Sequence, residues 1–401
     1  MSGHHEEHGI DATKLPPELG RRLVTAGAAL TGVGALGCLA AFVVDRQRFA
    51  FSYLTGFVWL VTIALGALFF VLIQHLTRAG WSVAARRHME WITAVLPWCA
   101  LLFLPVAAMA HGLYHHWMGE SASRDALLKA KSGYLNPTFF FARAFVFFAL
   151  WSLGARWFSR QSSAQDAGGD PAFTARMQVA SAPSTAVFAL TLTFAAFDWL
   201  MSLDPHWYST IFGVYVFAGA VTSSLSALAL ITIALQRAGL LQRVSTVEHR
   251  HDIGKLLFGF TVFWAYIAFS QYFLIWYAGI PEETIFFKHR WIGGWRAVSL
   301  ILCVGHFVVP FCVLMSRHAK RSALVLGSTS ALLLAMHFVD LYWLVMPTLD
   351  VQGARFTWID VVALALPLGV LSLVVAHKAS RGPLFPVNDP RLAEATQLQN
   401  L

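Results

Sequence analysis

Residues 49–75 read FAFSYLTGFVWLVTIALGALFFVLIQH, a run without Asp, Glu, Lys or Arg. A helix needs about 20 mainly apolar residues to cross the hydrocarbon core of a bilayer, so this run predicts a membrane-spanning helix. Nine further stretches meet the same criterion: 23–44, 90–110, 137–158, 183–203, 207–235, 256–280, 293–315, 322–346 and 356–377. The sequence therefore predicts an all-α integral membrane protein with ten transmembrane helices.

The overall composition agrees with this prediction. Hydrophobic residues make up 57% of the 401-residue chain, charged residues only 12%, and the mean hydropathy is +0.60. This composition excludes an ordinary water-soluble domain. The net charge of +8 comes without a basic stripe interleaved with aromatic residues in a soluble segment, so we expect anionic phospholipid rather than nucleic acid as the counter-charge.

The cysteines argue against redox cofactors within the chain. The chain has four cysteines, Cys38, Cys99, Cys303 and Cys312. All of them lie in predicted helices, and they form neither a C-x-x-C nor a C-x-x-C-H motif. Disulfides, iron–sulfur clusters and covalently attached haem are therefore not expected. His306 in the eighth helix has no mid-membrane histidine at matched depth on another helix, so haem b is not expected either.

The loops indicate how the chain is oriented. Ten spans place both termini on one side, and most of the 29 Lys and Arg residues fall in the tails and loops of that side. Because positive loops stay in the cytoplasm, both termini are predicted to be cytoplasmic. Helices 2–5 and 6–9 both begin on the outer side, which predicts two four-helix bundles flanked by helices 1 and 10.

These helices define the expected division of the chain. It comprises a cytoplasmic polar tail (1–20), peripheral helix 1 (21–45), a first four-helix bundle (46–205), a second (206–350), peripheral helix 10 (351–380) and a cytoplasmic tail (381–401). The first tail contains His4, His5 and His8. A short exposed tail of this kind is usually a solvated leader, although histidines can also bind a metal. We expect no metal site.

Ionisable residues at bilayer depth are the main functional evidence, since each costs a few kcal/mol on insertion scales and usually faces a bundle interior or a wet cavity. Those expected in the outer half, or at the outer turn, are His111, Arg143, Asp198, Asp204, His206, His337, Asp340 and Asp360. His337 and Asp340 are three residues apart and share a helix face. A histidine beside a carboxylate can accept protons from a hydroquinone. The alternative is a structural ion-pair network, such as Arg143 with Asp198 or Asp360.

The inner half carries fewer ionisable groups. The polar residues that can line a proton half-channel there are Glu90, Ser223, Ser224, Tyr266 and Ser330. Hydroxyl groups with trapped water could connect the cytoplasm to the midplane. Serines in membrane helices also simply allow close packing, and both interpretations stay open.

One long motif resembles a known family. Residues 197–220, FDWLMSLDPHWYSTIFGVYVFAGA, resemble the membrane quinol subunits of bacterial alternative complex III, in the NrfD/polysulfide-reductase membrane-subunit family. Further similar segments are YLNPTFFFARAFVFFALW (134–151), QYFLIWYAGIPEET (271–284), GWRAVSLILCVGHFVVPF (294–311) and HFVDLYWLVMP (337–347). The chain looks most like the second, shorter of the two such subunits, the ActF-like one.

The resemblance implies a setting for the chain. It implies the bacterial inner membrane, a quinol such as menaquinol as substrate near the periplasmic face, and no redox metal within the chain. The implied partners are a sister NrfD-type membrane subunit, an iron–sulfur subunit, a multihaem cytochrome c subunit and a terminal oxidase. Haem and iron–sulfur clusters are then expected only in these partners. Arg143, Asp198, Asp204, His206 and the pair in helix 9 lie within the similar segments.

The expected function is that of a non-autonomous membrane subunit of a quinol:cytochrome c oxidoreductase. In this reading the chain contributes to quinol oxidation at the periplasmic side, to proton conduction, or to both. One alternative is a scaffold and proton-conducting subunit without a working quinone site. A secondary transporter is less favoured, because the helix-interrupting prolines Pro97, Pro105 and Pro310 show no pairing between the two halves.

Overall fold

The computed structural model describes residues 13–241 and 243–400. Within those residues it contains helices and no strand, and ten helical segments are long and apolar enough to cross a membrane. The chain is therefore an all-α, multi-pass membrane protein, as predicted. The expected histidine-containing tail, with His4, His5 and His8, lies outside the described residues.

The spanning segments are mostly single helices. They are α1 (Pro17–Val44), α2 (Arg46–Leu76), α3 (Val83–Thr93) with α4 (Leu96–Ala108), α8 (Pro137–Gly168), α9 (Ala172–Trp199), α10 (Phe212–Arg237), α11 (Val247–Ala278), α13 (Trp295–Leu302) with η3 (Cys303–Val308) and α14 (Val309–Met315), α16 (Ala323–Val345) and α17 (Trp358–Arg381). The short elements at the ends are α5 (Ala110–Leu113), α6 (His115–Met118), η1 (Glu120–Arg124), α7 (Ala126–Lys131), η2 (Met201–Leu203), α12 (Pro281–His289), α15 (Arg317–Arg321), η4 (Met346–Thr348) and α18 (Leu392–Thr396).

Several helices are longer than their apolar stretches. α9 begins at Ala172 rather than near residue 183, and α8 continues to Gly168 instead of ending near residue 158. A helix of 32 residues, such as α8, is about 48 Å long at 1.5 Å per residue, whereas the hydrocarbon core is about 30 Å thick. Their polar ends therefore project from the membrane, where apolar composition no longer marks the helix.

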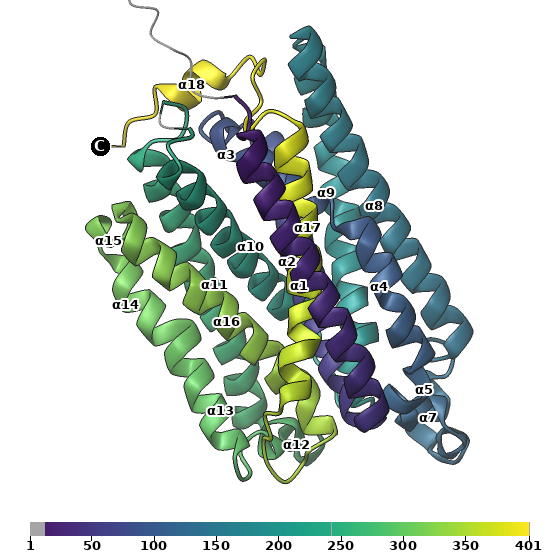
Figure 1. The fold of residues 1–401 in the computed structure, drawn as a ribbon. Helices are drawn as coiled ribbons and strands as arrows, with labels where there is room; N and C mark the ends of the chain where they lie inside the picture. Colours follow the sequence, from purple (N-terminus) through teal and green to yellow (C-terminus); the bar gives the residue numbers. More distant parts are fainter. Residues whose placement is uncertain (1–12, 242, 401) are drawn as a thin grey trace, which may run out of the picture.

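The spans form two groups of four. α2 packs against α3, α4 and α9, and α8 completes this group through α4 and α9. α10 packs against α11 and α16, and the α13–α14 segment contacts both of these. The groups meet where α2 contacts α10, while α1 and α17 pack against each other and against α2. Figure 1 shows the α1–α17 pair lying across the two groups, which matches the predicted bundles and flanking helices.

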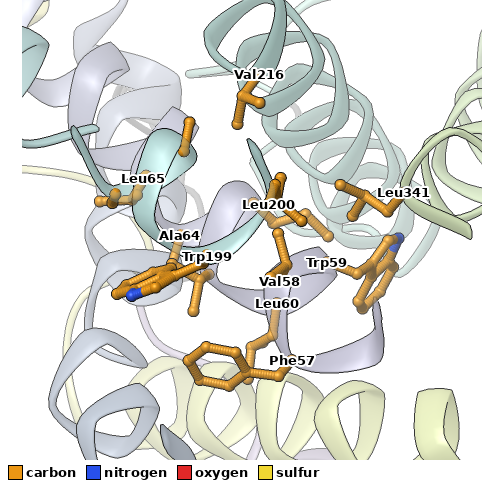
Figure 2. Close-up of a cluster of buried hydrophobic side chains, with 14 of the residues drawn as sticks. Phe57, Val58, Trp59, Leu60, Ala64, Leu65, Trp199, Leu200, Val216 and Leu341 are labelled. Atoms are coloured by element: carbon orange, nitrogen blue, oxygen red, sulfur yellow. The ribbon is translucent and has the colours of Figure 1, made fainter. Parts of the chain in front are cut away.

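The centre of the molecule is built around α2, which is buried along most of its length. Figure 2 shows Phe57, Trp59 and Leu60 of α2 near Trp199 at the end of α9 and Leu341 of α16. Aromatic packing is dense here, since the Phe57 and Trp199 rings lie 5.9 Å apart. A helix that is apolar on all sides belongs in such a position, surrounded by other helices.

Small residues allow α1 and α17 to approach closely. A Cβ added to Gly27 would lie 2.7 Å from Leu373 Cα, and one added to Gly34 would lie 2.6 Å from Leu366 Cα. Between membrane helices, glycine contacts of this kind replace the missing hydrophobic driving force with close van der Waals packing.

Gly34→Leu should therefore destabilise the protein. Overpacking costs about 1–3 kcal/mol, and more where the backbone cannot move apart. The measurement is the thermal unfolding midpoint of the purified chain in detergent. Gly32→Leu is the matched control, because a Cβ on Gly32 meets no atom within 4 Å. Equal midpoints for the two variants would contradict close α1–α17 packing.

The C-terminal tail folds back over the end of the bundle that carries Thr13, which we call the tail end. Leu384 N–H donates to Thr13 O at 2.8 Å, and Arg86 of α3 forms an ion pair of 2.5 Å with Asp389. Asp166 of α8 pairs with Arg87 at 2.6 Å and accepts from the tail at Val387 N–H, at 3.1 Å. The opposite end, with α7 and α12 (Figure 1), is called the distal end.

Candidate functional site

A cavity of about 680 Å³ lies near the distal end, between α11, α12 and the α13–η3 segment. Aromatic side chains form much of its wall: Tyr215, Trp264, Phe269, Tyr272, Trp276, Phe287, Trp291, Phe307 and Trp343. Phe269, Trp276 and Leu300 are exposed on the outside of the helices, so the cavity opens sideways toward the lipid. A concave, mainly apolar cavity with a few polar groups is typical of a small-molecule site.

The deep wall of this cavity holds a buried carboxylate. Tyr215 of α10 and Trp264 of α11 line the cavity, and both donate hydrogen bonds to Asp340 of α16. The Tyr215 hydroxyl donates to Oδ1, and Trp264 Nε1 donates to Oδ2 at 3.1 Å. Asp340 is only 2% exposed, so the phenol and the indole stand between its carboxylate and the cavity.

Two histidines lie beside this carboxylate. The expectation that His306 has no histidine of another helix near its depth is wrong, because His337 of α16 lies close enough to act on it electrostatically. The His306 ring stacks on Trp264 with centroids 3.9 Å apart, and neither of its ring nitrogens has a hydrogen-bond partner among the described residues. His337 Nε2 shares a 2.8 Å hydrogen bond with Thr62, whereas its Nδ1 has no partner within the described chain. Buried polar atoms of this kind normally bind ordered water. His306 also lies in η3, a π-helical segment, and such segments are frequent at functional sites.

His337 and Asp340 come together as the sequence predicted. A Cβ added to Gly219 would lie 3.1 Å from His337 Nδ1 and 3.8 Å from Asp340 Oδ2. Glycine at this position of α10 therefore leaves room for both side chains. With Tyr215, the pair places acid–base groups at three depths: the Tyr215 phenol at the cavity wall, the Asp340 carboxylate behind it and the His337 imidazole one helix turn away.

Arg290 stands at the distal edge of the cavity. Arg290 is buried, and its guanidinium carbon lies 3.4 Å from the centroid of the Phe286 ring. The guanidinium donates hydrogen bonds to the carbonyl oxygens of Trp343 at 3.0 Å and Leu344 at 2.9 Å. Burial lowers the pKa of Arg290 to about 9, which leaves it protonated at neutral pH. Arg290 and Lys288, which also lines the cavity, place positive charge beside a mainly apolar space.

Arg143 and Asp198 form a separate cluster. Arg143 Nε donates to Asp198 Oδ2 at 2.7 Å and its terminal nitrogen donates to Oδ1 at 2.9 Å. The guanidinium also lies 3.9 Å from the Tyr134 ring centroid and 4.1 Å from that of Phe139. This bidentate pair links α8 to α9 and leaves the carboxylate engaged. This geometry fits the interpretation of Arg143 and Asp198 as a structural ion pair between helices.

Asp360 forms a third cluster at the distal end, and its cation is Arg48 rather than Arg143. Arg48 contacts Asp360 at 2.8 Å and Asp350 at 2.5 Å, and Ser52 donates to Asp360 at 2.6 Å. These contacts join α2 to the start of α17. The sequence pattern placed Arg48 in an outer loop, but the residue is buried because the first turn of α2 packs against α17.

The other outer-half candidates do not join a common site. His111 is exposed. His206 pairs with Asp125 at 2.7 Å on the distal surface, and this hydrogen bond lowers the pKa of Asp125. Asp204 is partly buried near the distal turn and is close enough to Arg290 for its charge to oppose the lowering of the Arg290 pKa by burial. The expected polar core is thus divided: the His337–Asp340 cluster reaches the distal cavity through Tyr215 and Trp264, and Asp204 approaches the edge of that cavity at Arg290.

The inner candidates also separate. Glu90 is buried between Arg87 at 3.3 Å and Arg86 at 3.8 Å and lines a second cavity at the tail end. Ser223, Ser224 and Ser330 are buried. Ser223 and Ser224 donate to carbonyl oxygens of their own helix, which fits close packing, whereas Ser330 Oγ has no partner among the described residues. Tyr266 is 63% exposed on the outside of α11 and cannot line an interior channel.

None of the residues that line the cavity was predicted from the sequence, and the most important of those missed are Tyr215, Trp264 and Arg290. Tyr215 and Trp264 look like ordinary packing aromatics, and Arg290 falls in the loop between the predicted spans 256–280 and 293–315. Tyr215 lies in the motif 197–220, which is the one signal that pointed to it. The burial of Arg290 and the approach of α10, α11 and α16 depend on tertiary packing.

The chain is therefore a multi-pass α-helical membrane protein with buried acid–base groups behind a lipid-facing aromatic cavity. No protein-family model matches its sequence, and no curated protein matches it. The geometry of this cavity is accordingly the main basis for assigning a function.

Proposed function

We propose that the chain is a quinol-handling membrane subunit of a quinol:cytochrome c oxidoreductase of the alternative complex III type. The observation that carries the proposal is the distal cavity, in which Tyr215 and Trp264 separate a lipid-accessible aromatic space from the buried Asp340. The sequence resemblance described above agrees with this assignment.

The shape and chemistry of the cavity suit an isoprenoid quinol. The headgroup is a flat ring that can lie among aromatic side chains, and offset or edge contacts between rings favour such packing. The opening between α11 and α13 allows the apolar tail to remain in lipid. Gln271, which also lines the cavity and accepts from Ser209 at 3.0 Å, offers a polar contact to one quinol oxygen.

Proton transfer follows from the order of the polar groups. Oxidation of one quinol releases two electrons and two protons. The Tyr215 hydroxyl accepts a proton from one quinol oxygen as it passes its own to Asp340, and His337 with ordered water carries that proton onward. The second proton takes the same route once the first has left Asp340. An iron–sulfur cluster held by a partner subunit at the distal end would accept the two electrons.

The proposal includes a location and partners. The Lys and Arg distribution supports cytoplasmic termini, which makes the distal end periplasmic in a bacterial inner membrane. The partners are then the sister NrfD-type subunit, the iron–sulfur subunit, the multihaem cytochrome c subunit and a terminal oxidase, with menaquinol or a related quinol as substrate. Haem and iron–sulfur clusters belong to these partners.

A scaffold and proton-conducting subunit without a working quinone site is the second candidate. It is favoured by the Arg143–Asp198 and Arg48–Asp360 ion pairs, which are fully engaged in joining helices. Buried charges of this kind can serve only to hold the packing. If the chain is such a scaffold, protons would enter at Glu90, which lines the cavity at the tail end.

Blocking the cavity tests the proposal. Cys303 lines the cavity, and Cys312 is also exposed on the same transmembrane segment but lies outside it. Cys303→Trp should abolish incorporation of a photoreactive quinone into this chain and lower quinol:cytochrome c turnover by at least about tenfold, because the indole occupies the space of the headgroup. Both are measured on the purified complex.

Cys312→Trp is the matched control and should leave labelling and turnover near wild-type values. Size-exclusion chromatography establishes that each variant complex is assembled. Unchanged labelling and turnover in an assembled Cys303→Trp complex would reject the quinone site and leave the scaffold function.

A further inference from the structure

The second cavity, about 670 Å³ in volume, lies toward the tail end between the α3–α4 span, α8 and α17. Its basic residues are Arg156 and Arg160 of α8 and Lys378 of α17. The two arginines are four residues apart and therefore lie on one helix face. Three cations from two helices converge on this space.

None of these three cations has an ion pair within the described residues, whereas Arg86 and Arg87 nearby are both paired with carboxylates. Glu90 is the one carboxylate among the residues that line the cavity, and Arg86 and Arg87 already balance it. The cavity therefore carries an excess of positive charge that no described side chain neutralises.

The wall opposite the cations is apolar. Trp98 and Leu101 line the same cavity and are 51% and 57% exposed. Farther along α4, Leu104 is also exposed, so an apolar surface leads from the basic groups toward the middle of the membrane. A positively charged pocket that continues into an apolar groove matches an amphiphile with an anionic head.

We propose that this cavity binds an anionic phospholipid of the tail-end leaflet. Arg156, Arg160 and Lys378 contact the phosphodiester, and an acyl chain lies over Trp98 and Leu101. Basic pockets between transmembrane helices are suited to such headgroups. A free phosphate ester would use the same cations but would gain nothing from the apolar wall. The proposal does not depend on the quinol function.

Native mass spectrometry of the full chain in nonionic detergent tests the proposal. The probes are dioleoylphosphatidylglycerol, the zwitterionic dioleoylphosphatidylcholine and glycerol 3-phosphate. Phosphatidylglycerol should bind in preference to the other two. Arg156→Gln with Arg160→Gln should weaken its binding by roughly 30-fold, as expected for the loss of two near-surface charges.

Arg176→Gln with Arg237→Gln removes the same charge from exposed positions outside the cavity and should change binding by less than about twofold. Lys378→Gln should give an intermediate loss, and Trp98→Ala should weaken the lipid but not glycerol 3-phosphate. The proposal is overturned if phosphatidylcholine binds equally well, if the double pocket variant keeps wild-type affinity, or if glycerol 3-phosphate displaces the lipid at equal concentration. Unchanged thermal unfolding midpoints establish that the variants are folded.

Discussion

Asp340→Asn should lower the quinol:cytochrome c turnover of the purified complex by roughly 100-fold or more, the lower range for loss of a positioned general base. The substitution keeps the size of the side chain but removes its capacity to take the proton that Tyr215 passes on. The carboxylate accepts one hydrogen bond on each oxygen, from Tyr215 and from Trp264. An amide has only one oxygen and can keep only one of these two acceptor positions. Turnover is measured with a soluble quinol and cytochrome c.

The control variant is Asp350→Asn. Asp350 is another distal carboxylate, but it pairs with Arg48 outside the cavity, so near wild-type turnover is expected. Quinone photolabelling separates binding from proton transfer, because Asp340→Asn should retain the label. A shifted pH profile of the residual activity is a further expected result, since a purely structural role would lower turnover equally at every pH. An assembled Asp340→Asn complex with turnover within twofold of wild type would remove Asp340 from the proton route.

Asp198→Asn should act on stability instead. It leaves Arg143 buried without its counter-charge, and breaking a buried ion pair from one side costs about 3–5 kcal/mol. We expect a lower thermal unfolding midpoint and a poor yield of folded chain in detergent.

The double variant Arg143→Gln with Asp198→Asn separates packing from catalysis. It replaces the ion pair by two neutral groups that can hydrogen-bond, so it should recover much of the lost stability. If the recovered complex turns over normally, Asp198 is a structural residue. Wild-type stability of the single Asp198→Asn variant, or loss of turnover in a stable double variant, would contradict this assignment.

The fold was largely predictable because the hydrocarbon core imposes a minimum apolar length on every span. That rule located all ten spans, including residues 322–346, which the structure has as Ala323–Val345. It could not locate helix ends in water, where backbone hydrogen bonding continues without an apolar requirement. The start of α9 at Ala172 illustrates this limit.

The candidate site was predictable only where both members lie on one helix. His337 and Asp340 share a face of α16 however the helices pack, because they are three residues apart on one helix. The structure places them together. Partners on different helices depend on which spans become neighbours, so Asp360 could be matched to Arg48 only once α2 and α17 were seen in contact. Tyr215 and Trp264 gain their role in the same way, from the approach of α10 and α11 to α16.

The folded-back C-terminal tail has a consequence for biosynthesis. The ribosome reaches Asp389 only after every spanning helix has been made, so Arg86 has no tail carboxylate during synthesis and membrane insertion. A nascent chain that stops short of residue 384 would lack both this ion pair and the contact of Leu384 with Thr13. These contacts of the C-terminal tail can therefore form only after α17 has been made.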